Sequence, residues 1–112
     1  MHPPSVPTAA DTALDQIVNR LVDAYHPEQI YLFGSVARGD AGPDSDYDLI
    51  VLMPDNASPE LLKSRAGYRA SRDVGVPRDV LVMRLAEFTR QLSLRASLPS
   101  TVVREGHLVY GG

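Results

Sequence analysis

The chain has 112 residues, a length that suits one domain able to bury about two-thirds of the surface that its unfolded form exposes. Eleven basic and fourteen acidic residues give a net charge of −3, so the composition offers no general attraction for DNA or RNA, and we expect no direct nucleic-acid binding. Cysteine is absent, which excludes disulfides and thiolate metal sites. The N-terminus lacks the apolar core of a signal peptide and no apolar run is long enough to span a membrane, so we expect a cytoplasmic protein without membrane contact.

The first quarter of the sequence predicts a tail followed by an amphipathic helix. Residues 1–7 contain three prolines and little to bury, so we expect a flexible tail, with residues 8–112 forming a single domain. Thr8 and Asp11 have the spacing of a capping arrangement at a helix start, and Pro27 ends the helix. Apolar residues at helical spacing mark its buried face: Leu14, Ile17, Val18, Leu21, Val22 and Tyr25.

Three short apolar segments predict β-strands. Residues 29–33 (QIYLF) are closed by Gly34, and residues 47–53 (YDLIVLM) are followed by Pro54. Residues 78–84 (RDVLVMR) form the third segment, in which we expect Val80, Leu81 and Val82 to be buried on both faces of the sheet.

Two further helices are predicted around the third strand. Ser58 is a candidate cap for a helix that runs to about Asp73, and Leu85, Phe88 and Leu92 mark the buried face of a helix after the strand. The first of these helices is strongly basic. We expect its charges to form a solvated face, the alternative being contact with ATP phosphates or an acidic partner; these residues are Lys63, Arg65, Arg69 and Arg72.

The C-terminal segment fits two patterns. Ser97 can cap a helix with Pro99 in its first turn and Gly106 past its end, followed by a short strand. Alternatively, residues 100–103 and 107–110 can pair as a hairpin; we favour the helix and strand. The order of elements predicts an α/β (α+β) fold, with a mixed sheet of three to four strands flanked by helices.

Gly34 and Ser35 directly follow a predicted buried strand. Glycine lets the main chain approach a ligand closely, so backbone N–H groups and the serine hydroxyl can meet a phosphate. A short helix starting at Ser35 would add the favourable field of its N-terminus. Taken alone, a Gly-Ser pair is more often an ordinary turn.

Asp46 and Asp48 precede and enter the second predicted strand, on the same side of it. They would lie about 7 Å apart, so both carboxylates can converge on one divalent cation or a close pair. The alternative is a turn in which Asp44, Ser45 and Asp46 cap local backbone groups. Asp79 opens the third strand and would supply a third carboxylate if that strand lies next to the second. It could then ligate metal and accept a proton, whereas the plainer alternative is a solvated residue paired with Arg78 or Arg84.

The whole pattern, Gly34-Ser35, then residues 36–45, then Asp46-Tyr47-Asp48, resembles the signature of the polymerase-β nucleotidyltransferase superfamily. The nearest likeness is to the minimal nucleotidyltransferase (MNT) proteins, over residues 12–110, through the motifs GSxARG (residues 34–39) and SDxDL (45–49) and an REG…LVY ending (104–110). The resemblance implies a polymerase-β-like fold, with Gly34 and Ser35 holding the phosphates of ATP. It also implies that Asp46, Asp48 and Asp79 are catalytic and that they bind two Mg²⁺ ions. Arg38, Gly39 and Ser45 match the same motifs and are expected on the nucleotide-binding side of the site.

The resemblance also implies a protein partner. Larger members of the superfamily carry a further domain for the acceptor, and 112 residues leave no room for it, so we expect the acceptor to come from another chain. Minimal proteins of this kind resemble the type VII antitoxin of a pair whose toxin, encoded by the neighbouring gene, is a HEPN-type ribonuclease. The implied reaction is transfer of AMP from ATP to a tyrosine of the toxin, within a hetero-oligomer. Two alternatives are an antitoxin that acts by binding alone and the catalytic subunit of a two-subunit enzyme that modifies a small molecule.

Overall fold

The computed structural model describes residues 9–40, 42 and 45–111, so the predicted tail at residues 1–7 and the predicted cap at Thr8 lie outside the described part. Four strands, five α-helices and two short 3₁₀ helices (η1 and η2) follow one another in that part. Their bounds are α1 Ala9–Tyr25, β1 Gln29–Phe33, α2 Gly34–Arg38, β2 Tyr47–Met53, η1 Pro59–Leu62, α3 Arg65–Ala70, η2 Arg72–Val74, β3 Arg78–Arg84, α4 Leu85–Gln91, α5 Leu98–Glu105 and β4 His107–Gly111.

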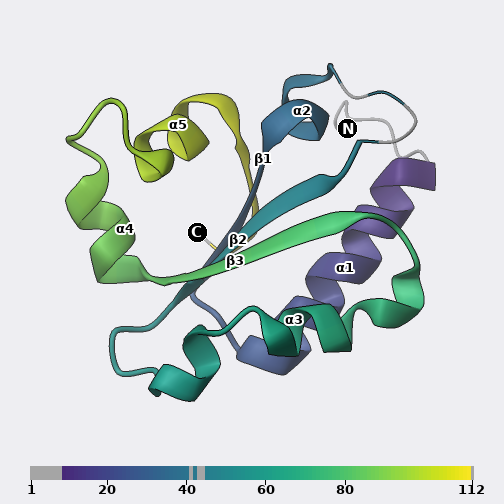
Figure 1. Cartoon of the computed structure of the whole chain (residues 1–112), viewed down its shortest axis with the longest axis horizontal. Coiled ribbons are helices and arrows are strands. Elements are labelled where there is room, and N and C mark those ends of the chain that lie inside the picture. The colour runs from purple at the N-terminus through teal and green to yellow at the C-terminus, as the bar shows by residue number, and fades with distance from the viewer. Residues whose placement is uncertain (1–8, 41, 43–44, 112) are drawn as a thin grey trace.

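The strands form one mixed sheet in the order β3-β2-β1-β4. β1 pairs antiparallel with β2 and with β4, whereas β2 and β3 are parallel. A parallel pair needs a crossover, and here the connection passes through η1, α3 and η2. Helices α1 and α3 cover one face of the sheet, and α4 and α5 cover the other (Figure 1). The predicted mixed sheet flanked by helices is confirmed.

Strand β2 is the centre of two apolar clusters, one on each face of the sheet. Leu49 and Val51 point to the α1 face, where Ile17 and Leu21 are fully buried. The side chains of Ile50 and Leu52, which alternate with these, point to the other face and pack with Phe88 and Val102 of α4 and α5. Burial on both sides explains why the strand reads as an unbroken apolar run.

The predicted continuous helix from Ser58 to about Asp73 is wrong, because the segment is divided into η1, α3 and η2. Lys63 is extended between η1 and α3, and its carbonyl accepts a hydrogen bond from the Tyr25 hydroxyl at 2.6 Å. The same hydroxyl accepts from the Gly67 N–H at 2.8 Å. In a continuous helix that N–H would bond directly to the Lys63 carbonyl four residues earlier. A side chain from α1 thus replaces a helical hydrogen bond, and the helix is interrupted there.

Two smaller expectations about burial are also wrong. Leu81 is 41% exposed, since β3 is an edge strand and the short helices α4 and α5 leave part of its outer face uncovered. Leu92 lies just past the end of α4 and is 37% exposed, so it does not belong to the buried face of that helix.

At the C-terminus, the helix followed by a strand is confirmed and the hairpin is wrong. The Ser97 hydroxyl accepts the N–H of Ser100 at 3.2 Å, which caps α5 as predicted, and β4 then pairs with β1. None of the helices in the described ranges combines the length and apolar character needed to cross a membrane.

Replacement of Leu21 tests the cluster on the α1 face. Leu21 is fully buried, so Leu21→Ala leaves a cavity and should lower the free energy of unfolding by about 2–5 kcal/mol. Leu94 is 58% exposed, and Leu94→Ala should stay within about 0.5 kcal/mol of the unmodified chain. Urea unfolding followed by circular dichroism measures both; equal losses would contradict the arrangement of this core.

Candidate active site

The predicted carboxylates lie where β2 and β3 begin. In the sheet register, Asp48 is the partner of Asp79 on β3 and of Phe33 on β1. Because paired residues on neighbouring strands face the same way, Asp48 and Asp79 point to the same face of the sheet. Asp46 directly precedes β2 and is exposed. Side chains 31 residues apart in the sequence are therefore neighbours in the fold.

Asp79 is exposed, as the plainer alternative expects, but the predicted pairing with a neighbouring arginine is wrong. The Arg78 guanidinium donates to the Ser71 hydroxyl and to the carbonyls of Tyr68 and Val76. The Arg84 guanidinium donates to backbone carbonyls after β2. Within the described part of the chain, Asp79 has no ion pair with a basic side chain, and its carboxyl group interacts with Asp48 instead.

The Asp48 carboxyl has a pKa raised above its ordinary value. Partial burial is the largest cause, followed by the negative charges of Asp79 and Asp46 and by a hydrogen bond shared with Asp79. The positive charge of Arg38 opposes the rise but does not cancel it. The three carboxyl groups therefore interact electrostatically, and they lack a positive charge sufficient to balance them.

The donor set suits Mg²⁺, which prefers carboxylate oxygens and binds through a few of them together with substrate phosphates. A cation placed here would relieve the repulsion that raises the pKa of Asp48. The side chains themselves are not arranged as a complete site: among the described residues, no three acidic, histidine or cysteine side chains surround one point at metal-binding geometry. Metal binding by Asp46, Asp48 and Asp79 stays a prediction that fits the donor chemistry.

Gly34 lies against Asp48 at the junction of β1 and α2. Its φ is +78°, and a methyl group on its Cα would overlap the Asp48 Oδ2 atom. Glycine is therefore required both by the backbone conformation and by the close carboxylate. Helix α2 starts at this residue, and Phe33, which precedes it, offers no side-chain acceptor to the first N–H groups. These N–H groups and the half-buried Ser35 lie at the position where the sequence predicts a phosphate.

The other predicted nucleotide-binding residues have local partners. Arg38 is 43% exposed and forms ion pairs with Asp40 at 3.0 Å and with Glu105 of α5 at 3.7 Å. Gly39, with a φ of +81°, ends α2 in the left-handed conformation. The Ser45 hydroxyl accepts the N–H of Gly42 at 2.9 Å. These contacts are made within the protein itself, and nucleotide binding by the three residues stays a prediction.

One contact near the site had no sequence signal. His107 of β4, which has no metal-ligand spacing, places its Nε2 atom 2.9 Å from the Ala37 carbonyl of α2. The two residues are 70 positions apart, and no local pattern links them. The contact links the edge strand β4 to α2, the helix that begins at Gly34.

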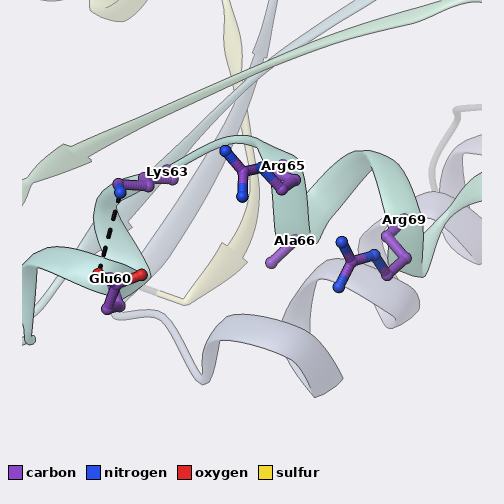
Figure 2. A pocket seen from close by; sticks show the side chains of 5 residues that line it. All are labelled: Glu60, Lys63, Arg65, Ala66 and Arg69. Atoms are coloured by element: carbon purple, nitrogen blue, oxygen red, sulfur yellow. Dashed lines mark ion pairs between the residues drawn. The ribbon is translucent and has the colours of Figure 1, made fainter.

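Three of the four basic residues predicted on the second helix line a separate surface hollow of about 190 Å³; these are Lys63, Arg65 and Arg69 (Figure 2). Lys63 forms an ion pair with Glu60 at 3.9 Å, drawn as a dashed line in Figure 2. Arg65 and Arg69 extend from α3, are exposed, and have no ion-pair partner in the described ranges. The residues that line the hollow include none of the predicted catalytic or nucleotide-binding residues. The exposure of these basic side chains agrees with the predicted solvated face.

Residues 14–106 match the family described as the nucleotidyltransferase domain. The chain belongs to this family. The match includes Gly34, Ser35 and all three aspartates of the candidate site. No curated protein sequence matches the chain.

Solved structures support the same fold. A toxin–antitoxin structure with AMP-PNP superposes with a TM-score of 0.60 at 24% identity, covering 88% of this chain and 73% of that one. A complex of tri-AMPylated HEPN toxin with MNT antitoxin from Shewanella oneidensis gives 0.57 at 20% identity, covering 90% and 71%. A protein from Sulfolobus solfataricus described as a nucleotidyltransferase gives 0.56 at 19% identity, covering 97% and 93%. At these identities the likeness shows the fold, and the predicted nucleotidyltransferase fold is confirmed.

The pKa of Asp48 predicts how stability depends on pH. Between the ordinary value of 3.8 and the raised value in the folded protein, the folded state binds more protons than the unfolded state, so stability falls as pH rises through this range. Asp48→Asn removes this effect and should be more stable than the unmodified chain at neutral pH, with the difference disappearing under acid conditions. Urea unfolding across an acid-to-neutral series, without divalent cations, measures it. A less stable variant at neutral pH would contradict the charge balance described here.

Two glycines with similar φ separate backbone strain from the contact with Asp48. At Gly39 a methyl group meets no atom of the described residues within 4 Å, so Gly39→Ala should cost only the left-handed strain, about 1–2 kcal/mol. Gly34→Ala has the same strain and also displaces Asp48, so its loss of stability should be larger by about 1–3 kcal/mol. Thermal and urea unfolding of both variants give the comparison. Equal losses would show that Asp48 does not press on Gly34.

Proposed function

We propose that the chain is a Mg²⁺-dependent nucleotidyltransferase that transfers AMP from ATP to a tyrosine hydroxyl of a HEPN-type ribonuclease and thereby neutralises this toxin as its antitoxin. The observation that carries the proposal is the pairing of Asp48 with Asp79 on neighbouring parallel strands, with Gly34 against Asp48. A family that transfers nucleotidyl groups supplies the reaction class. Carboxylates held beside a glycine at a helix start supply the groups that such a reaction needs.

The choice of acceptor is supported by two of the similar structures. One is a toxin–antitoxin structure with AMP-PNP, and another is a complex in which a HEPN toxin is tri-AMPylated and an MNT antitoxin is its partner. We infer that this chain has the same kind of partner and that its acceptor is a tyrosine hydroxyl presented by that second protein.

In the proposed reaction, the backbone N–H groups at Gly34 and Ser35 hold the triphosphate of ATP. Asp46 and Asp48 would bind Mg²⁺, which neutralises charge at the phosphates when bound. An Asp79 carboxylate oxygen accepts the proton of the tyrosine hydroxyl, whose oxygen forms a bond to the α-phosphorus. The bond from that phosphorus to the bridging oxygen breaks, and pyrophosphate leaves with the electron pair. The partner protein must orient the tyrosine for in-line attack.

Label transfer tests the proposal. Incubation of the chain with Mg²⁺, ATP labelled at the α-phosphate and the HEPN-type protein of the neighbouring gene should label that protein. Asp46→Ala, Asp48→Ala and Asp79→Ala should each lower the rate by about a hundredfold or more, because each removes a group that acts on the reacting atoms. Asp15→Ala, at an exposed position of α1, should leave the rate unchanged.

The other outcomes separate the alternatives. Inhibition of the ribonuclease without label transfer would replace the proposal by an antitoxin that acts through binding alone. Label on a small hydroxyl compound in place of the protein would indicate a subunit of a small-molecule nucleotidyltransferase. Unchanged transfer by the three aspartate variants would overturn the assignment of the site.

A further inference from the structure

Asp79 lies between two residues that are both held by α3 and the residue after it. On one side, Val80 donates its backbone N–H to the Tyr68 hydroxyl at 3.0 Å. On the other side, Arg78 donates from its guanidinium to the Tyr68 carbonyl at 2.8 Å and to the Ser71 hydroxyl at 2.6 Å. The guanidinium also lies over the Tyr68 ring, 5.6 Å from its centre. Tyr68 therefore contacts both chain neighbours of Asp79.

The hydrogen bond from Val80 matters because β3 is an edge strand. It pairs with β2 on one side and has no strand on the other side in the described sheet. The Tyr68 hydroxyl takes the place that the carbonyl of a further strand would have for the Val80 N–H. Exposed edges are less restrained than central strands, so this bond limits backbone movement next to Asp79.

The same contacts keep the positive charge of Arg78 away from Asp79. Side chains alternate along β3, so Arg78 and Val80 point to the α1 face while Asp79 points to the opposite face. Arg78 is fixed on the α1 face by its bonds to Ser71 and Tyr68. The Asp79 carboxylate therefore forms no ion pair with the guanidinium of Arg78.

The supporting segment is itself firmly attached to the core. Gly67, next to Tyr68, is closely packed: a methyl group added to its Cα would lie 3.0 Å from side-chain atoms of Leu21, Tyr25 and Val80. Its N–H donates a hydrogen bond to the Tyr25 hydroxyl. Ser71 is fully buried and donates its hydroxyl to the Gly67 carbonyl at 2.7 Å. Well-packed residues behind a functional side chain hold it in place, and Gly67 and Ser71 support Tyr68 in this way.

We propose that Tyr68 is a positioning residue for nucleotidyl transfer: its hydroxyl and carbonyl hold Val80 and Arg78, and this fixes Asp79 beside Asp48 in the orientation that accepts the proton. The inference rests on the proposed function, since Asp79 needs exact placement only if it acts on the acceptor. Tyr68 touches neither Asp79 nor the acceptor in this role, and it acts through β3.

Tyr68→Phe tests the proposal, because it removes the hydroxyl while keeping the ring under Arg78 and the carbonyl. In the chain without metal or nucleotide, amide exchange at Val80 measured by NMR should become about tenfold faster, with the buried Val51 amide unchanged. In the label-transfer assay, kcat should fall about tenfold while KM for ATP stays within about twofold, because the phosphate-binding turn is untouched. Tyr31→Phe is the matched control: it is half-buried, its ring stacks on Phe88, and its hydroxyl has no hydrogen-bond partner among the described residues.

Each outcome decides the matter. Faster exchange at Val80 with a lower kcat, and neither change in Tyr31→Phe, supports the role of Tyr68. An unchanged kcat, or an equal fall in both variants at a temperature where both are folded, overturns it. If the unmodified chain transfers no AMP, the proposed function fails, and with it the positioning role of Tyr68 in the reaction. The exchange measurement still reports whether the hydroxyl holds Val80.

Discussion

The parallel pairing of β2 with β3 is the constraint on which the candidate site depends. It places Asp79 next to Asp48, whereas an antiparallel pair would bring the other end of β3 to this position. The parallel direction requires the crossover through α3, and the crossover in turn supplies the groups that hold β3 from outside. One feature of topology thus determines both the meeting of the carboxylates and the support behind them.

The sequence predicted the strands well because their signals are local. The three strands predicted before the C-terminal segment have the observed bounds, since each is a short apolar run closed by polar or turn-forming residues. The interrupted helix between β2 and β3 was missed for the opposite reason. Its break depends on the Tyr25 hydroxyl, which comes from α1, and residues so distant leave no trace in a local pattern.

The same distinction applies to the site. Gly34, Ser35, Asp46 and Asp48 are recognisable because a motif of fixed spacing contains them. Asp79 was identifiable as a candidate, but its position beside Asp48 depends on strand order, which the sequence leaves open. The contacts of Tyr68 with Arg78 and Val80 were not predictable at all, because they need the packed position of α3.

The cluster of Asp46, Asp48 and Asp79 lowers the stability of the fold at one place, because like charges lie close together there. Elsewhere the polar groups are well matched: in the described part of the chain, no buried side-chain nitrogen or oxygen lacks a hydrogen-bond partner. At Asp48, by contrast, burial and two like charges act against the ionised form, and the nearby Arg38 offsets this only in part because it is already paired with Asp40 and Glu105. A local departure of this kind, within a structure that otherwise satisfies its polar groups, is typical of a functional site. The aspartates therefore lower the stability of the sheet where they meet, which agrees with the cation site proposed for them.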